Sequence, residues 1–225
     1  MEKQAHSQNN FIPYQGDMYP VDDMKDRSEN FFRFMNKRRS LRSFSDENFP
    51  IEVIENLIKA ASTAPSGAHK QPWSFCVIRD SKIKTAIRKA AEKEEYENYH
   101  GRMSEEWLDD LEQFDTDWHK PFLEIAPYLI VVFKKTYDLD KGDKKKNYYV
   151  NESVGLACGF LIAAIHNAGL VALTHTPSPM NFLMEILKRP KNEKPFLLIP
   201  IGYPAEDAEI PDLQRKALED VMTLY

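Results

Sequence analysis

The chain has 225 residues, 42% of them hydrophobic, so it can bury one substantial core, as one large domain or two small ones. Its formal net charge of -5 argues against a nucleic-acid partner, because binding a phosphate backbone requires a concentrated basic surface. The polar residues 1–10 exclude an ordinary signal peptide, and a soluble, cytoplasmic protein is expected.

Hydrophobic periodicity predicts an α+β protein in which long helices cover a β-sheet. A polar N-terminal arm is expected over residues 1–27 and a folded domain over 28–225. Helices are predicted over residues 28–37, 51–62, 82–99, much of 100–120, 153–167, 180–187 and 215–222. Strands are predicted over 73–78, 128–133, 170–173 and 196–201, and a charged loop over 138–146.

Two of these segments are expected to lie in the core. The strand at 128–133 is apolar throughout, which indicates burial on both faces. The helix at 154–165 is too short to cross a bilayer, so it is predicted to be buried, and no membrane partner is expected. Cys76 and Cys158 lie in apolar runs and are interpreted as buried thiols in a reducing compartment.

Three arginines lie close together at the end of the first predicted helix. Arg38, Arg39 and Arg42 offer guanidinium groups, and Ser40 between them offers a hydroxyl donor. These are the groups that bind a phosphate dianion. The alternative is a solvated basic helix end, and spacing alone favours that alternative.

Two short segments follow predicted elements and could approach a ligand. Pro65, Ser66 and Gly67 form a small turn that allows the backbone to approach a flat ligand closely; an ordinary loop is the alternative. Thr174 and Thr176 follow a predicted strand, where hydroxyls can donate to a cofactor nitrogen. A turn in which these hydroxyls bond to the backbone is equally compatible.

Glu95 and Tyr99 are four residues apart and therefore share a helix face. With a cationic partner they could bind a zwitterionic amino acid, although a solvated surface pair is the simpler interpretation. The histidines show no metal-ligand spacing, so no metal site is predicted. The glycine motifs of dinucleotide folds and P-loops are absent, as is the hydrolase nucleophile elbow.

Taken together, these segments resemble the nitroreductase superfamily of FMN enzymes. The resemblance rests on Arg-Arg-Ser-Leu-Arg-Ser-Phe at 38–44 followed by Pro-Ser-Gly-Ala-His-Lys-Gln-Pro-Trp at 65–73. Within the superfamily the chain is similar to the iodotyrosine deiodinases at residues 94–99, 151–159, 174–177 and 211–216. His175 is a departure, because the animal members usually have a threonine at that position.

The resemblance implies a nitroreductase-like fold with a central mixed β-sheet and a domain-swapped homodimer carrying FMN at its interface. It implies a substrate lid at about 92–120. Thr176 would be the catalytic residue that reaches flavin N5. The implied cofactor-binding residues are Arg38, Arg39, Ser40, Leu41, Arg42, Pro65, Ser66, Gly67, Thr174, His175, Thr176 and Arg215. The implied substrate-binding residues are Ala68, Glu95, Tyr99 and Lys120.

The activity implied is reductive dehalogenation of a halotyrosine to tyrosine and halide, by stepwise electron transfer from reduced flavin. The electrons would come from an external donor, and an NAD(P)H-linked reductase is one candidate. A general NAD(P)H-dependent nitroreductase or quinone reductase is the first alternative, but it would not need a clamp for a zwitterion. A non-enzymatic flavin or halotyrosine sensor is the second.

Overall fold

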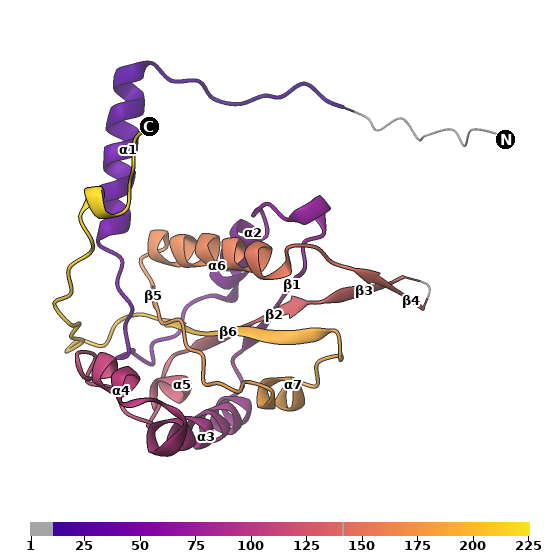
Figure 1. Ribbon diagram of the computed structural model, residues 1–225, viewed down its shortest axis with the longest axis vertical. Coiled ribbons are helices and arrows are strands. Elements are labelled where there is room, and N and C mark those ends of the chain that lie inside the picture. The colour runs from indigo at the N-terminus through magenta and orange to yellow at the C-terminus, as the bar shows by residue number, and fades with distance from the viewer. Residues whose placement is uncertain (1–10, 141) are drawn as a thin grey trace. The chain divides into compact units, whose positions relative to one another are not determined.

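The computed structural model describes residues 11–140 and 142–225, and the chain divides into two units, one ending at Lys37 and one from Arg38 to Tyr225 (Figure 1). The first unit contains a single helix, α1 (Val21–Asn36), which begins at Val21 rather than at Ser28. Asp22 and Asp23 in its first turn favour this earlier start, because carboxylates stabilise a helix N-terminus. The helix buries none of its side chains.

The larger unit is built on a four-stranded sheet with the order β1-β2-β6-β5. Its strands are β1 (Trp73–Ile78), β2 (Tyr128–Lys135), β5 (Val171–Ala172) and β6 (Glu193–Gly202). Neighbouring strands pair in antiparallel fashion, and a parallel bridge between Ser40 and Ala172 makes the sheet mixed. The four predicted strands are confirmed, although β5 is shorter than predicted.

Helices cover both faces of this sheet (Figure 1). One face carries α2 (Ile51–Ala61) and α6 (Val150–Asn167), and the other carries α3 (Ser81–Glu97), α5 (Phe122–Ile125) and α7 (Phe182–Ile186). The remaining helical pieces are η1 (Gly67–His69), η2 (Asn98–Arg102), α4 (Glu105–Glu112) and η3 (Leu218–Asp220). The fold is therefore α+β, as predicted.

Strand β2 lies at the centre of two apolar cores. Every residue from Tyr128 to Phe133 is buried. Side chains alternate between the faces of a strand, so Ile130 and Val132 pack under α2 and α6, while Leu129 and Val131 pack against the other helices. The uninterrupted apolar run thus has the two-sided burial that the sequence indicates.

Helix α6 has one face on this core and one face in solvent. Val154, Cys158 and Leu161 are buried, whereas Leu156 and Phe160 are 48% and 43% exposed. Burial raises the pKa of the Cys158 thiol to about 12, which leaves it unreactive. Among the described residues, no helix is long and apolar enough to span a membrane.

Three predictions of irregular or helical segments were wrong in detail. Residues 138–146 contain a hairpin rather than a loop: β3 (Tyr137–Asp140) pairs with β4 (Asp143–Lys146), and Lys141 lies outside the described residues. Opposite charges pair across this hairpin, as in the ion pair of Lys145 with Asp140, and such pairs stabilise two-stranded ribbons. Between residues 100 and 120 only η2 and α4 are helical, and the tail forms only η3.

Candidate active site

The predicted phosphate-binding residues line one cavity of about 270 Å³. Three segments surround it: residues 38–42, residues 173–174 just after β5, and residues 210–215 of the C-terminal tail. The predicted residues that line it are Arg38, Arg39, Ser40, Arg42, Thr174 and Arg215. Leu41 does not line the cavity: its side chain is buried, and its N–H donates to the Ala172 carbonyl at 3.3 Å. That bond fixes the arginine segment to the sheet.

The cavity is strongly positive. Burial lowers the pKa of Arg38, and the nearby charges of Arg215 and Arg39 lower it further. Arg215 also donates to the Arg38 carbonyl at 3.1 Å, which holds the C-terminal tail beside the cluster. Like charges gathered in a half-buried site repel each other, and a dianion placed between them would relieve that repulsion. The site therefore fits a phosphate group.

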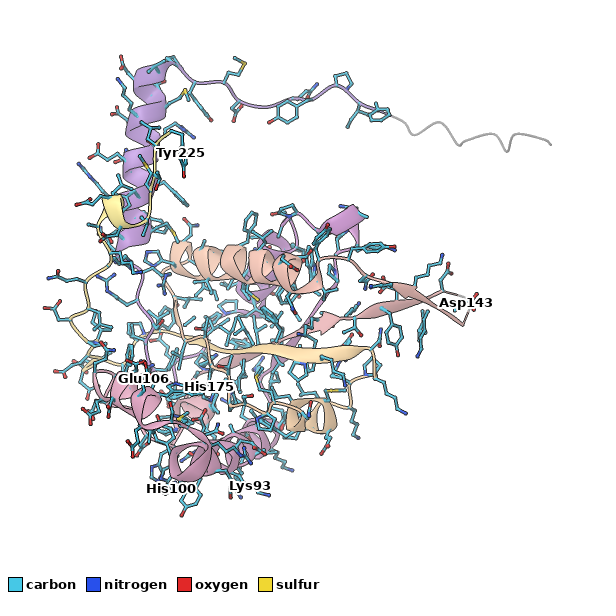
Figure 2. All side chains as sticks on the ribbon, viewed as in Figure 1. Lys93, His100, Glu106, Asp143, His175 and Tyr225 are labelled. Atoms are coloured by element: carbon cyan, nitrogen blue, oxygen red, sulfur yellow. The ribbon has the colours of Figure 1, made fainter. Side chains whose placement is uncertain are left out.

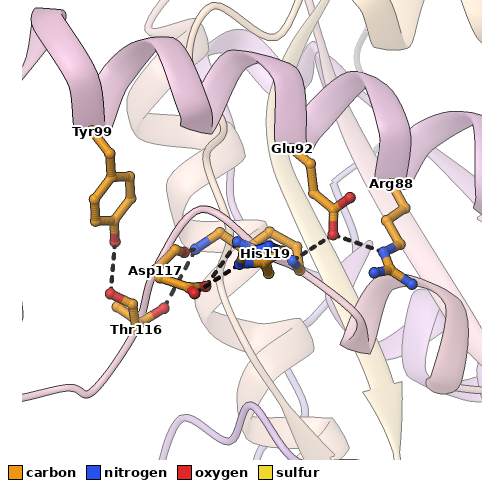
Figure 3. A network of polar contacts seen from close by, with 7 residues as sticks. Arg88, Glu92, Tyr99, Thr116, Asp117 and His119 are labelled. Carbon is orange, nitrogen blue, oxygen red and sulfur yellow. Dashed lines mark hydrogen bonds and ion pairs between the residues drawn. The ribbon is translucent and has the colours of Figure 1, made fainter.

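A second cluster of charged residues brings Glu95, Tyr99 and Lys120 together, as predicted. The Lys120 ammonium lies 5.6 Å from the centre of the Tyr99 ring, and it donates to the Asp117 carbonyl and to Thr116 Oγ1. The Tyr99 hydroxyl donates to the Thr116 carbonyl at 3.1 Å, a contact visible in Figure 3. These bonds join the end of α3 to the turn at 116–120.

Glu95 and Lys120 are both buried, with exposed fractions of 7% and 4%. Burial raises the pKa of Glu95 and lowers the pKa of Lys120, and each group's charge opposes the shift of the other. In the described part of the chain the two groups influence each other without forming a direct ion pair. A buried anion and cation held apart in this way can accept the ammonium and the carboxylate of one zwitterion.

The predicted lid region at 92–120 is held together by aromatic contacts as well. Tyr96 stacks on His100 with ring centres 4.0 Å apart, and it meets Trp118 edge-on at 5.4 Å. Figure 3 shows a further anchor, in which Glu92 accepts bonds from Arg88 and from the backbone N–H of Lys120. The segment that carries the clamp is therefore ordered by its own side chains.

The segment after β5 sends its side chains to opposite sides. Leu173, His175 and Pro177 are buried, while Thr174 and Thr176 are exposed, the alternation of an extended chain. Figure 2 places His175 between the sheet and the helices of the α3 face. The His175 ring meets Phe122 edge-on at 5.5 Å. The two threonines thus share a face, and the His175 side chain lies on the other.

The His175 imidazole is uncharged at neutral pH. Burial, with the charges of Lys120 and Arg42, lowers its pKa from 6.5 to about 3. As pH falls below 6.5 the unfolded chain binds a proton at this residue and the folded chain does not, so stability is lost between about pH 6.5 and 3. Between pH 7.5 and 5.0, we expect the free energy of unfolding of the wild type to fall by about 2 kcal/mol more than that of His175→Leu.

Urea denaturation of the two proteins at both pH values measures this difference. The comparison cancels every other titrating group that the two proteins share. Equal losses in the two proteins would show that His175 is protonated as easily in the folded chain as in the unfolded one.

The predicted flavin-ring loop lies elsewhere in the unit. Ser66 Oγ accepts from the Gln71 N–H at 2.9 Å, and the Gly67 N–H donates to Ser153 Oγ at 3.3 Å. A Cβ on Gly67 would lie 2.9 Å from the Tyr149 ring, so only glycine fits at this approach. Ala68 has a left-handed backbone, with φ of 50°. Pro65 is exposed beside this turn.

The loop and the arginine cavity lie at opposite ends of α6. The loop contacts Ser153 in the first turn of the helix, whereas β5, which follows its last turn, leads to Thr174 in the cavity. The helix has 18 residues and is therefore about 27 Å long. One copy of the chain thus carries two separate halves of the predicted flavin site.

Several residues of the cavity and the clamp were not predicted as site residues. Phe114 lines the cavity, and its ring lies 5.2 Å from the Arg42 guanidinium. Thr116 and Asp117 supply the carbonyls that hold Tyr99 and Lys120. The sequence signal for Phe114 is an aromatic residue in an acidic stretch that also carries Trp107 and Trp118. Contacts made by backbone carbonyls leave no signal in the sequence.

The comparisons with known proteins agree with these findings. The model of the nitroreductase family matches residues 35–203. An iodotyrosine deiodinase of Haliscomenobacter hydrossis is 65% identical over 216 residues, covering 96% of this chain and 97% of that protein. An iodotyrosine deiodinase of Danio rerio is 50% identical over 217 residues, covering 95% of this chain and 73% of that protein.

A solved structure supports the same assignment. The crystal structure of oxidized iodotyrosine deiodinase bound to FMN and 3-iodo-L-tyrosine superimposes with a TM-score of 0.74 and 31% identity. The match covers 86% of this chain and 100% of that chain. This chain belongs to the nitroreductase family and, within it, to the iodotyrosine deiodinases.

Proposed function

We propose that this protein uses FMN to remove iodide reductively from iodotyrosine. One observation carries the proposal: the same fold unit holds a positive cavity suited to a phosphate and a buried Glu95–Lys120 pair suited to a zwitterion. Relatives named iodotyrosine deiodinase, at 65% and 50% identity, support it. A general nitroreductase would have no use for the buried clamp.

The cofactor's phosphate would be bound in the arginine cavity. Arg38, Arg42 and Arg215 would supply charge, with Arg39 and the Ser40 hydroxyl as further donors. Thr174 and Thr176 would present hydroxyls to the flavin edge, and Thr176 would donate to flavin N5. When bound, FMN supplies the two electrons that, with a proton, convert iodotyrosine to tyrosine and iodide.

The substrate would be oriented by the clamp. Glu95 would bind the ammonium, Lys120 the carboxylate, and Tyr99 would hydrogen-bond within the closed lid. The Ala68 N–H would donate to the phenolate oxygen. Because the lid at about 92–120 carries all three clamp side chains, substrate binding would hold it closed over the flavin and exclude water from the reacting ring.

The flavin site would be completed by a second copy of the chain. A twofold axis across α6 would bring the N-terminal end of one helix to the C-terminal end of the other. The loop at 65–68 of one protomer would then lie beside the arginine cavity of its partner. Exposed Leu156 and Phe160, with open space beside Gly155 and Gly159, give α6 an apolar face for this contact. The N-terminal arm and α1, which buries no side chain, would exchange between the protomers.

This arrangement predicts the effect of placing charge on α6. Leu156→Glu with Phe160→Glu should convert a dimer to a monomer and lower FMN affinity about tenfold, because burying carboxylates at an apolar interface is costly. Analytical ultracentrifugation and flavin titration measure both effects. Ile83→Glu, at an exposed apolar residue of α3 on the other face of the sheet, is the control. A double variant that stays dimeric would place the interface elsewhere.

Anaerobic stopped-flow kinetics test the activity itself. Dithionite-reduced protein should be reoxidised faster by 3-iodotyrosine than by buffer, with release of free iodide. Reoxidation at the rate seen without ligand would refute the deiodinase proposal. Binding without iodide release would indicate a sensor. Replacing dithionite by NAD(P)H with a reductase would identify the class of electron donor.

A further inference from the structure

The His175 ring and the Glu95 carboxylate face each other across a short gap. His175 Nε2 lies 4.0 Å from Glu95 Oε1, and both side chains are about nine-tenths buried. Among the described residues Nε2 has no hydrogen-bond partner, and none donates to the Glu95 carboxylate. A buried polar atom without a partner is costly, so Nε2 needs a partner, and the nearby Glu95 carboxylate can supply one.

The backbones that carry these two side chains are fixed. His175 exchanges two hydrogen bonds with Leu198 of β6, at 2.9 and 3.0 Å, which attaches its segment to the sheet. Three residues after Glu95 and three after His175, the two segments meet again, where Asn98 Nδ2 donates to the Ser178 carbonyl at 2.9 Å. This second contact ties the end of α3 to the same segment. A shift of about 1 Å in the side chains would therefore suffice to join Nε2 to the carboxylate.

The chemistry of the pair is suited to binding a cation. A neutral imidazole carries one N–H donor, and Lys120 and Arg42 nearby disfavour a second proton. If the N–H is on Nε2, it can hold one Glu95 oxygen and leave the other for an ammonium. Thr174 and Thr176 flank His175 on the opposite side of the same segment, so the clamp and the predicted flavin edge share one rigid element.

We infer that His175 is a positioning residue for the substrate clamp: its Nε2–H holds the Glu95 carboxylate in place to receive the substrate ammonium. This inference rests on the proposed function. It gives the histidine a role on the substrate side, where the resemblance implied a place at the flavin edge. A threonine at this position would be too short to make the same contact.

The test uses the FMN-bound protein and three ligands that differ at the amino-acid end. They are 3-iodotyrosine, 3-iodotyramine without the carboxylate, and 3-(4-hydroxy-3-iodophenyl)propionate without the ammonium. Dissociation constants are measured by quenching of flavin fluorescence. His175→Leu should weaken iodotyrosine and iodotyramine about tenfold, the loss of one charge-assisted hydrogen bond, and leave the propionate within about twofold.

Two further variants keep the result specific. His175→Gln matches leucine in size but restores a donor near the Nε2 position, and it should recover most of the lost affinity. In a Glu95→Gln background, His175→Leu should have little further effect, because its target is already gone. Equal weakening of all three ligands, or weaker FMN binding, would overturn the inference in favour of simple packing. Unchanged affinities would also overturn it.

Failure of the proposed function would look different. In that case the wild-type protein would release no iodide from iodotyrosine, whatever the His175 variants bind. Failure of the present inference would leave wild-type iodide release intact and would appear only in the comparison of His175→Leu with His175→Gln.

Discussion

Replacing Arg38 and Arg215 together by glutamine is expected to lower FMN affinity about a hundredfold, because two charge-assisted contacts to one phosphate would be lost. Riboflavin, which has the same ring system and no phosphate, should bind the double variant within about twofold of the wild type. Burial and the charges of Arg215 and Arg39 lower the pKa of Arg38, so the change also removes repulsion among the arginines. The variant also loses the bond from Arg215 to the Arg38 carbonyl, so its free energy of unfolding is measured beside that of the wild type.

Flavin titrations with both ligands measure the effect. Arg79→Gln with Lys82→Gln, at two exposed cations outside this cavity, removes the same number of positive charges and should not alter either affinity. A parallel loss of FMN and riboflavin binding would show that the arginines shape the ring site or the fold. Unchanged FMN binding would move the phosphate to another part of the chain.

The sequence was sufficient where the signal is local. The apolar run at 128–133 predicts a strand buried on both faces, and β2 has that burial. The arginines at 38, 39 and 42 lie within five positions, so the backbone alone places them in one cavity. Local spacing did not decide between a phosphate site and a solvated helix end; the resemblance to a family did.

The parts that were missed depend on contacts between distant residues. Residues 138–146 are highly charged and were predicted to be a loop, but cross-strand pairing makes them a hairpin. Lys120 lies 25 positions after Glu95, so spacing gives no sign that the two meet; the resemblance implied Lys120 as a clamp residue, and bonds to Thr116 and Asp117 hold its ammonium. The direction of the His175 side chain depends on where β5 ends. Hydrophobic periodicity over so few residues cannot predict that end.

The largest effects on substrate binding should come from the clamp itself. We expect Glu95→Gln and Lys120→Gln each to weaken 3-iodotyrosine binding about a hundredfold, about 2.7 kcal/mol, since removing one partner of a buried charge–charge contact with a ligand costs roughly 2–5 kcal/mol. FMN affinity should stay within about twofold, because neither residue lines the arginine cavity. Glu97→Gln, exposed near the end of the same helix, is the matched control.

The two truncated ligands separate the roles of the two residues. Iodotyramine retains only the ammonium, so it should be weakened by Glu95→Gln and little affected by Lys120→Gln. The iodophenylpropionate retains only the carboxylate, so its binding should be weakened by Lys120→Gln and little affected by Glu95→Gln. If the double variant binds iodotyrosine no worse than either single variant, the residues act as one unit on a single zwitterion. If both variants weaken the binding of all ligands and of FMN equally, the buried charges stabilise the lid and do not bind the substrate. The choice between a deiodinase and a general nitroreductase would then rest on the reaction kinetics.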